Sequence, residues 1–184
     1  SQAAAQLRYR ATTLRPAFIV LTETHLNGDA VEAEMLPSGY VVSARKDRTQ
    51  HGGGVIILSQ EHLLVNELKL DDFYQAEVAE IIGVEWNEYY IFGGYTQSSK
   101  AAPKMFDSFT RIKEDEAYVG KKTIFLCDAN AHSVEFLGSK YTDAAGECAQ
   151  EFSELFHMEQ CVDFPTREDN ICLLYTSDAA DDLG

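Results

Sequence analysis

The feature that most constrains this fold is a series of short apolar segments with no helical segment between them. AFIVLTE at 17–23, YVVSARK at 40–46 and VIILS at 55–59 are separated by Asn-Gly, Pro-Ser-Gly and Gly-Gly-Gly turn sequences. Such runs bounded by turn residues predict β-strands. HLLVNELKL at 62–70 alternates like a half-exposed strand, and segments 76–86 and 88–96 meet at a tight Asn-Glu connection that predicts a hairpin.

Helical patterns flank this series of strands. Residues 2–14 and the segments 102–119 and 144–158 carry apolar residues at helical spacing, whereas 121–130 and 160–164 are typical of strands. Many consecutive strands do not fit a doubly wound parallel sheet. The sequence therefore predicts a mixed α/β (α+β) domain in which two mixed β-sheets pack face to face with helices outside.

Composition limits the class of protein. The chain has 184 residues, of which 45% are hydrophobic, and this suits one globular domain. No apolar run reaches the roughly 18 residues needed to span a bilayer. The absence of C-x-x-C pairs and N-x-[ST] sequons favours an intracellular, reduced protein. A net charge of −15 argues against a surface that coats nucleic acid, but not against an enzyme that holds a cation and touches DNA at a few points.

The last residues differ from the rest. A codon string that encodes the peptide CLLYTSDAAD at 172–181 resembles the transposase mosaic-end adapter used to build sequencing libraries. We therefore expect a domain at 1–171 and a non-native tail at 172–184, which is excluded from fold prediction. Without this tail, which carries three aspartates and no basic residue, the net charge is still −12.

Polar side chains follow the ends of three predicted strands. Glu23 follows the first, Tyr95 ends another, and Asp128, Asn130 and His132 follow TIFLC. Residues i and i+2 of an extended segment share a face, so the last three are predicted to point the same way. A carboxylate such as Glu23 suits Mg²⁺, Asp128 suits activation of water, and Tyr95 suits donation to developing charge.

Each of these residues also has a simpler interpretation. A glutamate after a strand is often a turn residue, and Asp-x-Asn commonly forms a turn with its own backbone. A tyrosine at a strand end usually packs, and a lone histidine such as His132 is more often a loop residue than a catalyst. The glycines of HGGGV have no following G-K-[ST] and therefore predict a tight turn and no phosphate loop.

Taken in order, the segments resemble a known family. FIVLTETHL resembles the metal-carboxylate motif of the endonuclease/exonuclease/phosphatase superfamily. ARKDRTQHGGGVIIL resembles the R-x-D-R and G-G-G-V stretch of endonucleases from non-LTR (LINE-like) retrotransposons, and CDANAH resembles their G-D-F-N-A-H. The region that follows also resembles theirs, up to a closing P-T-R, so the resemblance covers residues 5–169 in collinear order.

The resemblance implies a four-layer sandwich that nicks DNA with Mg²⁺ or Mn²⁺, so that the new 3′-hydroxyl primes reverse transcription. By motif position Glu23 is the metal ligand, and Asp128, Asn130 and Tyr95 are catalytic. Two further positions, Arg48 and His132, are expected to contact DNA. The implied partners are target DNA and a reverse transcriptase domain on the same polypeptide, with nuclear localisation of the parent element and no membrane.

Departures from the family pattern also matter. The family's first strand, with its metal-site Asn, precedes the matched region, and its Ser-Asp-His motif follows P-T-R, where the adapter-like tail stands. We therefore expect the fold to be truncated at both ends and the fragment to be inactive. Cys127 and Ala129 replace the Gly and Phe of the motif. The alternatives are another phosphodiesterase or phosphatase of the superfamily, or a catalytically dead binding module of the same fold.

Overall fold

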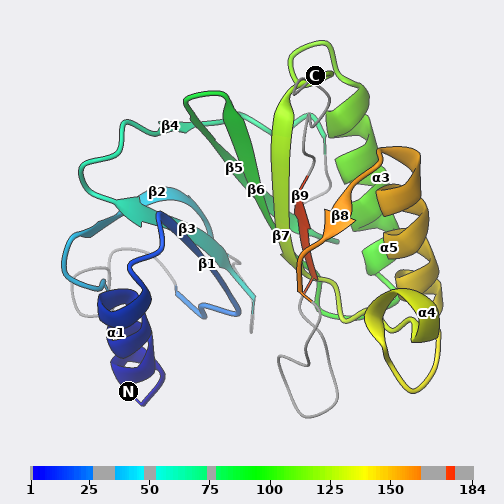
Figure 1. The fold of residues 1–184 in the computed structure, drawn as a ribbon, viewed down its shortest axis with the longest axis horizontal. Helices are drawn as coiled ribbons and strands as arrows, with labels where there is room; N and C mark the ends of the chain where they lie inside the picture. The colour runs from blue at the N-terminus through cyan, green and yellow to red at the C-terminus, as the bar shows by residue number, and fades with distance from the viewer. Residues whose placement is uncertain (1, 27–35, 48–52, 74–77, 163–172, 177–184) are drawn as a thin grey trace, which may run out of the picture.

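The computed structural model describes residues 2–26, 36–47, 53–73, 78–162 and 173–176. Two β-sheets pack face to face, and helices cover their outer faces (Figure 1). Helix α1 lies against a three-stranded sheet, and helices α3 and α5 lie against a six-stranded sheet. The prediction of two packed sheets with helices outside, in four layers, is confirmed.

The three-stranded sheet contains the first three predicted strands. Its order is β1 (Phe18–Thr22), β3 (Val55–Gln60) and β2 (Tyr40–Lys46), with β3 in the centre. Both pairings are antiparallel, so within the described residues only the other sheet is mixed. The backbone of β2 is irregular between Val42 and Ala44, where the register with β3 shifts.

The six-stranded sheet has the order β4-β5-β6-β7-β9-β8. Its strands are β4 (Asn66–Glu67), β5 (Glu80–Trp86), β6 (Tyr89–Tyr95), β7 (Lys122–Asp128), β8 (Glu159–Gln160) and β9 (Leu173–Thr176). Strands β5 and β6 form the predicted hairpin. The β6–β7 pair is parallel, because α3 crosses over between the two strands.

Two segments differ from expectation. The prediction of a strand at 62–70 is wrong for most of this segment, because only Asn66–Glu67 forms a strand paired with β5 and Leu64 is 91% exposed. The chain turns directly after β3 and then reaches the edge of the other sheet, so few residues of the segment meet a partner strand. Within the predicted tail, Leu173–Thr176 pairs with β7 and β8. Backbone pairing does not identify the origin of that segment, and its non-native origin stays a prediction.

Local signals at the ends of the helices set their bounds. Helix α1 (Gln2–Leu14) is followed by Arg15, whose left-handed φ of 48° ends the helix. Helix α3 (Ala102–Glu114) has a proline in its first turn. Asp143 caps α5 (Ala144–Leu155), and a short helix, α4 (Val134–Leu137), was not predicted. None of the helices in the described ranges is long and apolar enough to cross a membrane.

Apolar side chains fill each space between neighbouring layers. The largest cluster lies under α3 and α5, where the rings of Phe92 and Phe125 stack at 4.8 Å and Phe125 meets Phe152 at 5.2 Å. A second cluster lies between the sheets, and a third lies under α1. Gly93 and Gly94 of β6 allow the layers on both sides to pack closely against this strand. A Cβ on Gly94 would lie 2.7 Å from the Phe109 ring on the helix side, and a Cβ on Gly93 would lie 3.1 Å from Val20 on the side of the other sheet.

Candidate active site

Three neighbouring strands of the six-stranded sheet present a row of polar residues at one end. Tyr95 of β6 lies opposite Glu80 of β5 in the antiparallel ladder and opposite Asp128 of β7 in the parallel ladder. Ile82 and Leu126, two residues away on β5 and β7, belong to the apolar layer between the sheets. Because alternate residues of a strand share a face, the polar row also faces the three-stranded sheet.

Glu23 reaches this row from the other sheet. It follows the last residue of β1 and adopts a left-handed backbone with φ of 53°. The Tyr95 hydroxyl donates a hydrogen bond of 2.7 Å to Glu23 Oε1. Tyr95 itself is buried, with 3% of its surface exposed, whereas Glu23 is exposed. The structure therefore brings together two of the predicted site residues that are 72 positions apart.

The surroundings of Tyr95 keep its phenol protonated. Burial is the largest cause that raises its pKa, followed by the hydrogen bond to Glu23 and by the negative charges of Glu23, Asp128 and Glu80. Each of these disfavours the phenolate, either by removing water or by repulsion. Tyr95 is therefore a neutral hydrogen-bond donor at neutral pH.

Asp128 and Asn130 form a turn at the end of β7. The Asn130 N–H donates to Asp128 Oδ1 at 3.3 Å, and Asn130 has a left-handed φ of 46°. The Asn130 side-chain amide donates to the Thr96 carbonyl at 3.0 Å, and the Thr96 N–H donates to the Asp128 carbonyl at 3.2 Å. The Asp-x-Asn sequence is thus a turn, and it also joins the ends of β6 and β7 beside Tyr95.

His132 has different partners from the two residues before it. Burial still alternates as predicted, since Ala129 and Ala131 are buried. The His132 ring, however, places Nδ1 2.9 Å from Asp143 Oδ2 and stacks on Tyr141 with 4.5 Å between ring centres. The His132 N–H donates to Asp143 Oδ1 at 3.0 Å. His132 therefore joins the loop after β7 to the start of α5, and a contact with DNA stays a prediction.

Arg48 lies outside the described residues. The two basic residues before it are engaged with carboxylates: Arg45 donates two hydrogen bonds of 2.6 Å to Asp47, and Lys46 lies 3.5 Å from Asp71. The predicted phosphate contact of Arg48 therefore stays a prediction.

Glu80 is the residue of this site that sequence reasoning missed. Only 2% of it is exposed, and its Oε2 accepts a hydrogen bond of 3.0 Å from the Gly54 N–H. A signal was present in the sequence, because Glu80 stands in the same alternating set as Ile82 and Val84, which face the core. An acidic residue at an inward-facing position of a strand is uncommon and indicates a specific partner.

A divalent cation at this site would be held by few protein side chains. In the described ranges, no three Asp, Glu, His or Cys side chains converge to form a metal-binding cluster. Mg²⁺ does not require such a cluster, since it is often bound through one or two carboxylates, several waters and a substrate phosphate. The exposed carboxylate of Glu23 fits this type of binding.

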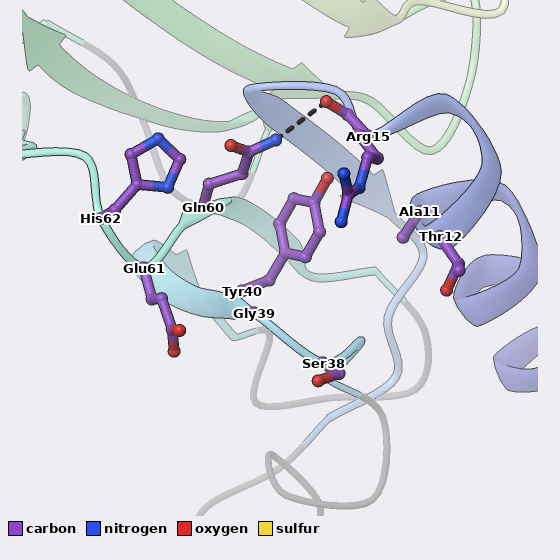
Figure 2. A pocket seen from close by; sticks show the side chains of 9 residues that line it. All are labelled: Ala11, Thr12, Arg15, Ser38, Gly39, Tyr40, Gln60, Glu61 and His62. Atoms are coloured by element: carbon purple, nitrogen blue, oxygen red, sulfur yellow. Dashed lines mark hydrogen bonds between the residues drawn. The ribbon is translucent and has the colours of Figure 1, made fainter.

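A large cavity lies elsewhere on the three-stranded sheet. It has a volume of about 480 Å³ and lies between the last turn of α1 and the turn that follows β3 (Figure 2). Gln60, at the end of β3, donates to the Arg15 carbonyl there at 2.8 Å. Glu23 follows the opposite end of this sheet, where Thr22 pairs with Val55. The cavity is therefore separate from the polar row.

Comparisons with known proteins agree on the fold. No protein-family model matches the chain, and no curated protein matches it. Among solved structures, the endonuclease domain of TRAS1, a telomere-specific non-LTR retrotransposon, matches with a TM-score of 0.66 and 18% identity over 96% of this chain and 80% of that one. The 3′ phosphatase NExo from Neisseria, bound to a product DNA hairpin, matches with a TM-score of 0.68 and 15% identity over 97% and 83%.

An AP endonuclease from Archaeoglobus fulgidus also matches, with a TM-score of 0.62 and 15% identity over 94% of this chain and 81% of that one. At these identities the comparisons show a shared fold. The chain therefore has the fold of these nucleases and of the 3′ phosphatase.

Proposed function

We propose that this chain belongs to a metal-dependent DNA endonuclease that nicks target DNA to prime reverse transcription in a retroelement polyprotein. The observation that carries the proposal is the contact between the Tyr95 hydroxyl and Glu23 Oε1, beside the Asp128–Asn130 turn. The motif order of the sequence and the shared fold with the TRAS1 endonuclease domain support it. The parent element is expected to act in the nucleus, with a reverse transcriptase on the same polypeptide.

The proposal gives each of the four side chains a task. Glu23 holds Mg²⁺ or Mn²⁺, and the bound ion supplies Lewis-acid stabilisation of charge on the phosphoryl group. Without substrate, the neutral phenol of Tyr95 orients the Glu23 carboxylate. Its single O–H turns from Glu23 to the phosphate as negative charge develops there. Asp128 accepts a proton from the attacking water, and Asn130 fixes the end of β7 through the Thr96 carbonyl.

Charge limits how the DNA is held. At a net charge of −15 the protein repels a polyanion over most of its surface, so binding depends on a few contacts and on the cation. Because few phosphates are neutralised, we expect weak binding that falls only shallowly with salt and rises when Mg²⁺ or Mn²⁺ is added.

Binding of Mn²⁺ tests the metal site directly. Titration of the 184-residue chain, followed by the loss of free-ion electron paramagnetic resonance signal, is expected to show one site that Glu23→Ala abolishes. Glu85→Ala is the matched control, because Glu85 also accepts a hydrogen bond from a tyrosine hydroxyl, that of Tyr90, at the other end of β5. Equal Mn²⁺ binding by the wild type and Glu23→Ala would refute the assignment of Glu23.

Nicking of supercoiled plasmid tests the activity. None of the five histidines matches the expected acid–base histidine, so the 184-residue chain is expected not to nick. A chain extended with the family's Ser-Asp-His segment is expected to nick with Mg²⁺, and Asp128→Ala should remove that activity. Nicking by the 184-residue chain that survives Glu23→Ala would contradict the proposed site.

A second substrate distinguishes the alternatives. The NExo match makes a DNA 3′-phosphate the appropriate competitor substrate. Release of phosphate from such an end without plasmid nicking would favour a phosphatase of the same fold. DNA binding without either reaction in the extended chain would favour a catalytically dead binding module.

A further inference from the structure

Glu80 is a buried carboxylate to which the proposed reaction gives no task. It begins β5, and only 2% of its surface is exposed. Removing a charged carboxylate from water is costly unless hydrogen bonds replace the lost hydration. Its retention at an inward-facing position of a strand therefore calls for a specific structural partner.

One partner of Glu80 lies at the start of a strand of the other sheet. Glu80 Oε2 accepts the Gly54 N–H at 3.0 Å, and Gly54 directly precedes β3. Gly54 is buried and has a φ of 94°, a conformation that strongly favours glycine. A Cβ at Gly54 would also collide with the Thr24 hydroxyl. One carboxylate thus links the six-stranded sheet to the tightly packed glycine that precedes β3 of the three-stranded sheet.

The same glycine segment holds the backbone next to Glu23. The His25 N–H donates to the Gly53 carbonyl at 3.0 Å, and the Thr24 N–H donates to the Gly54 carbonyl at 3.4 Å. Glu23 and His25 both have left-handed backbones, with φ of 53° and 52°. A left-handed conformation is uncommon for residues other than glycine, so two such residues this close together need surrounding contacts to persist.

These contacts form a closed ring. Glu80 holds Gly54, the Gly53–Gly54 carbonyls hold the Thr24–His25 backbone, and Glu23 accepts the Tyr95 hydroxyl. Tyr95 lies directly opposite Glu80 in the β5–β6 ladder, which completes the ring. The orientation of the proposed metal carboxylate is therefore tied to a residue of the opposite sheet.

We propose that Glu80 is a positioning residue, which holds Glu23 through the Gly53–Gly54 segment in the orientation that meets Tyr95 and binds the divalent cation. Its link to the cation rests on the proposed function, whereas its link to the Thr24–His25 backbone does not. This role requires a side chain at position 80 that is long enough for its oxygen to accept the hydrogen bond from the Gly54 N–H.

Two substitutions distinguish the effect of side-chain length at Glu80 from the effect of its charge. Glu80→Asp keeps the charge but shortens the side chain by one methylene, which withdraws the oxygen from Gly54. Glu80→Gln keeps the length and an acceptor oxygen but loses the charge. Glu85→Asp is the matched control, since Glu85 lies on the same strand and shortening it affects the hydrogen bond from Tyr90.

The first measurement is amide hydrogen exchange of the full chain, followed residue by residue by NMR without metal. Because a hydrogen bond to a charged group contributes about 1.5–3 kcal/mol, Glu80→Asp is expected to speed exchange at Gly54, Thr24 and His25 by about tenfold or more. Exchange in α5, which is remote from the ring, should stay as in the wild type, and Glu85→Asp should leave all three amides unchanged. Unchanged exchange at Thr24 and His25 in Glu80→Asp would overturn the proposal.

The second measurement is Mn²⁺ binding by the same variants. Glu80→Asp is expected to weaken binding about tenfold or more, Glu80→Gln to retain most of it, and Glu85→Asp to match the wild type. A wild-type chain that binds no Mn²⁺ would refute the metal assignment, and the exchange data would then decide the positioning role alone. If Glu80→Gln speeds exchange at Thr24 and His25 as much as Glu80→Asp does, the proposal that the length of the Glu80 side chain is what positions this backbone is overturned.

Discussion

Removal of the Asp143 carboxylate should destabilise the loop that follows β7. Asp143 accepts hydrogen bonds from the His132 N–H at 3.0 Å, from the Gly146 N–H at 2.8 Å and, through Oδ2, contacts His132 Nδ1 at 2.9 Å. Loss of a helix N-cap costs about 1 kcal/mol, and each of the two contacts with His132 contributes about 1 kcal/mol. For Asp143→Ala we expect a loss of about 3 kcal/mol, which is roughly 6–12 °C in Tm for a chain of this size.

The same residue should make stability depend on acidic pH. Burial alone raises the pKa of Asp143, but the hydrogen bonds from His132 and Gly146 outweigh it and hold the pKa below its ordinary value. As pH falls, the unfolded chain takes up this proton first, near about 3.9, while the folded chain does not. Protonation therefore favours the unfolded state, so this contribution is present above that pH and is lost as pH falls through the folded-state pKa.

Thermal unfolding followed by circular dichroism checks both expectations. Asp143→Ser retains a good N-cap but loses both contacts with His132, so it should cost about 2 kcal/mol. Asp143→Asn retains acceptor geometry without the charge and should flatten the acidic slope of Tm. Glu147→Ala, on an exposed first-turn residue of the same helix, is the control. If Asp143→Ala costs no more than Glu147→Ala, the reasoning is refuted.

Three further substitutions test other contacts through their effect on unfolding. Gly146→Ala should lower Tm despite the better helix propensity of alanine, because its Cβ would overlap the His132 carbonyl; a raised Tm would contradict this. Lys113→Met should leave Tm unchanged or raise it, because Lys113 is only 9% exposed and burial lowers its pKa. In the described part of the chain its ammonium donates to the neutral Thr123 hydroxyl at 3.2 Å and lies 5.6 Å from the centre of the Phe156 ring. A large loss of Tm would refute this. The phenol of Tyr95 ionises above about pH 10 in the unfolded chain but not in the folded chain, where its pKa is raised, so stability falls with pH in this range. Tyr95→Phe should therefore reduce this loss of stability. An unchanged slope of the unfolding free energy with alkaline pH, measured in urea, would disprove it.

Local patterns predicted most of the secondary structure. Apolar runs between turn residues located β1, β2 and β3, and the Asn-Glu connection located the β5–β6 hairpin. Strand 62–70 was predicted wrongly, because alternation describes a face and does not supply a neighbouring strand. The short helix α4 was missed, since four residues carry too little periodicity to identify a helix.

By itself, the sequence determined which residues end strands, and therefore that Glu23, Tyr95, Asp128 and Asn130 were candidates for one site. Only the tertiary structure decided which of them meet: it joined Glu23 to Tyr95 and placed His132 against Asp143. It also gave Glu80, which the alternation of its strand marked only as inward-facing, a partner in Gly54. The physical reason is that a strand's periodicity sets which face a side chain occupies. Its partners depend on how the two sheets pack, and that is settled by contacts between residues far apart in the chain.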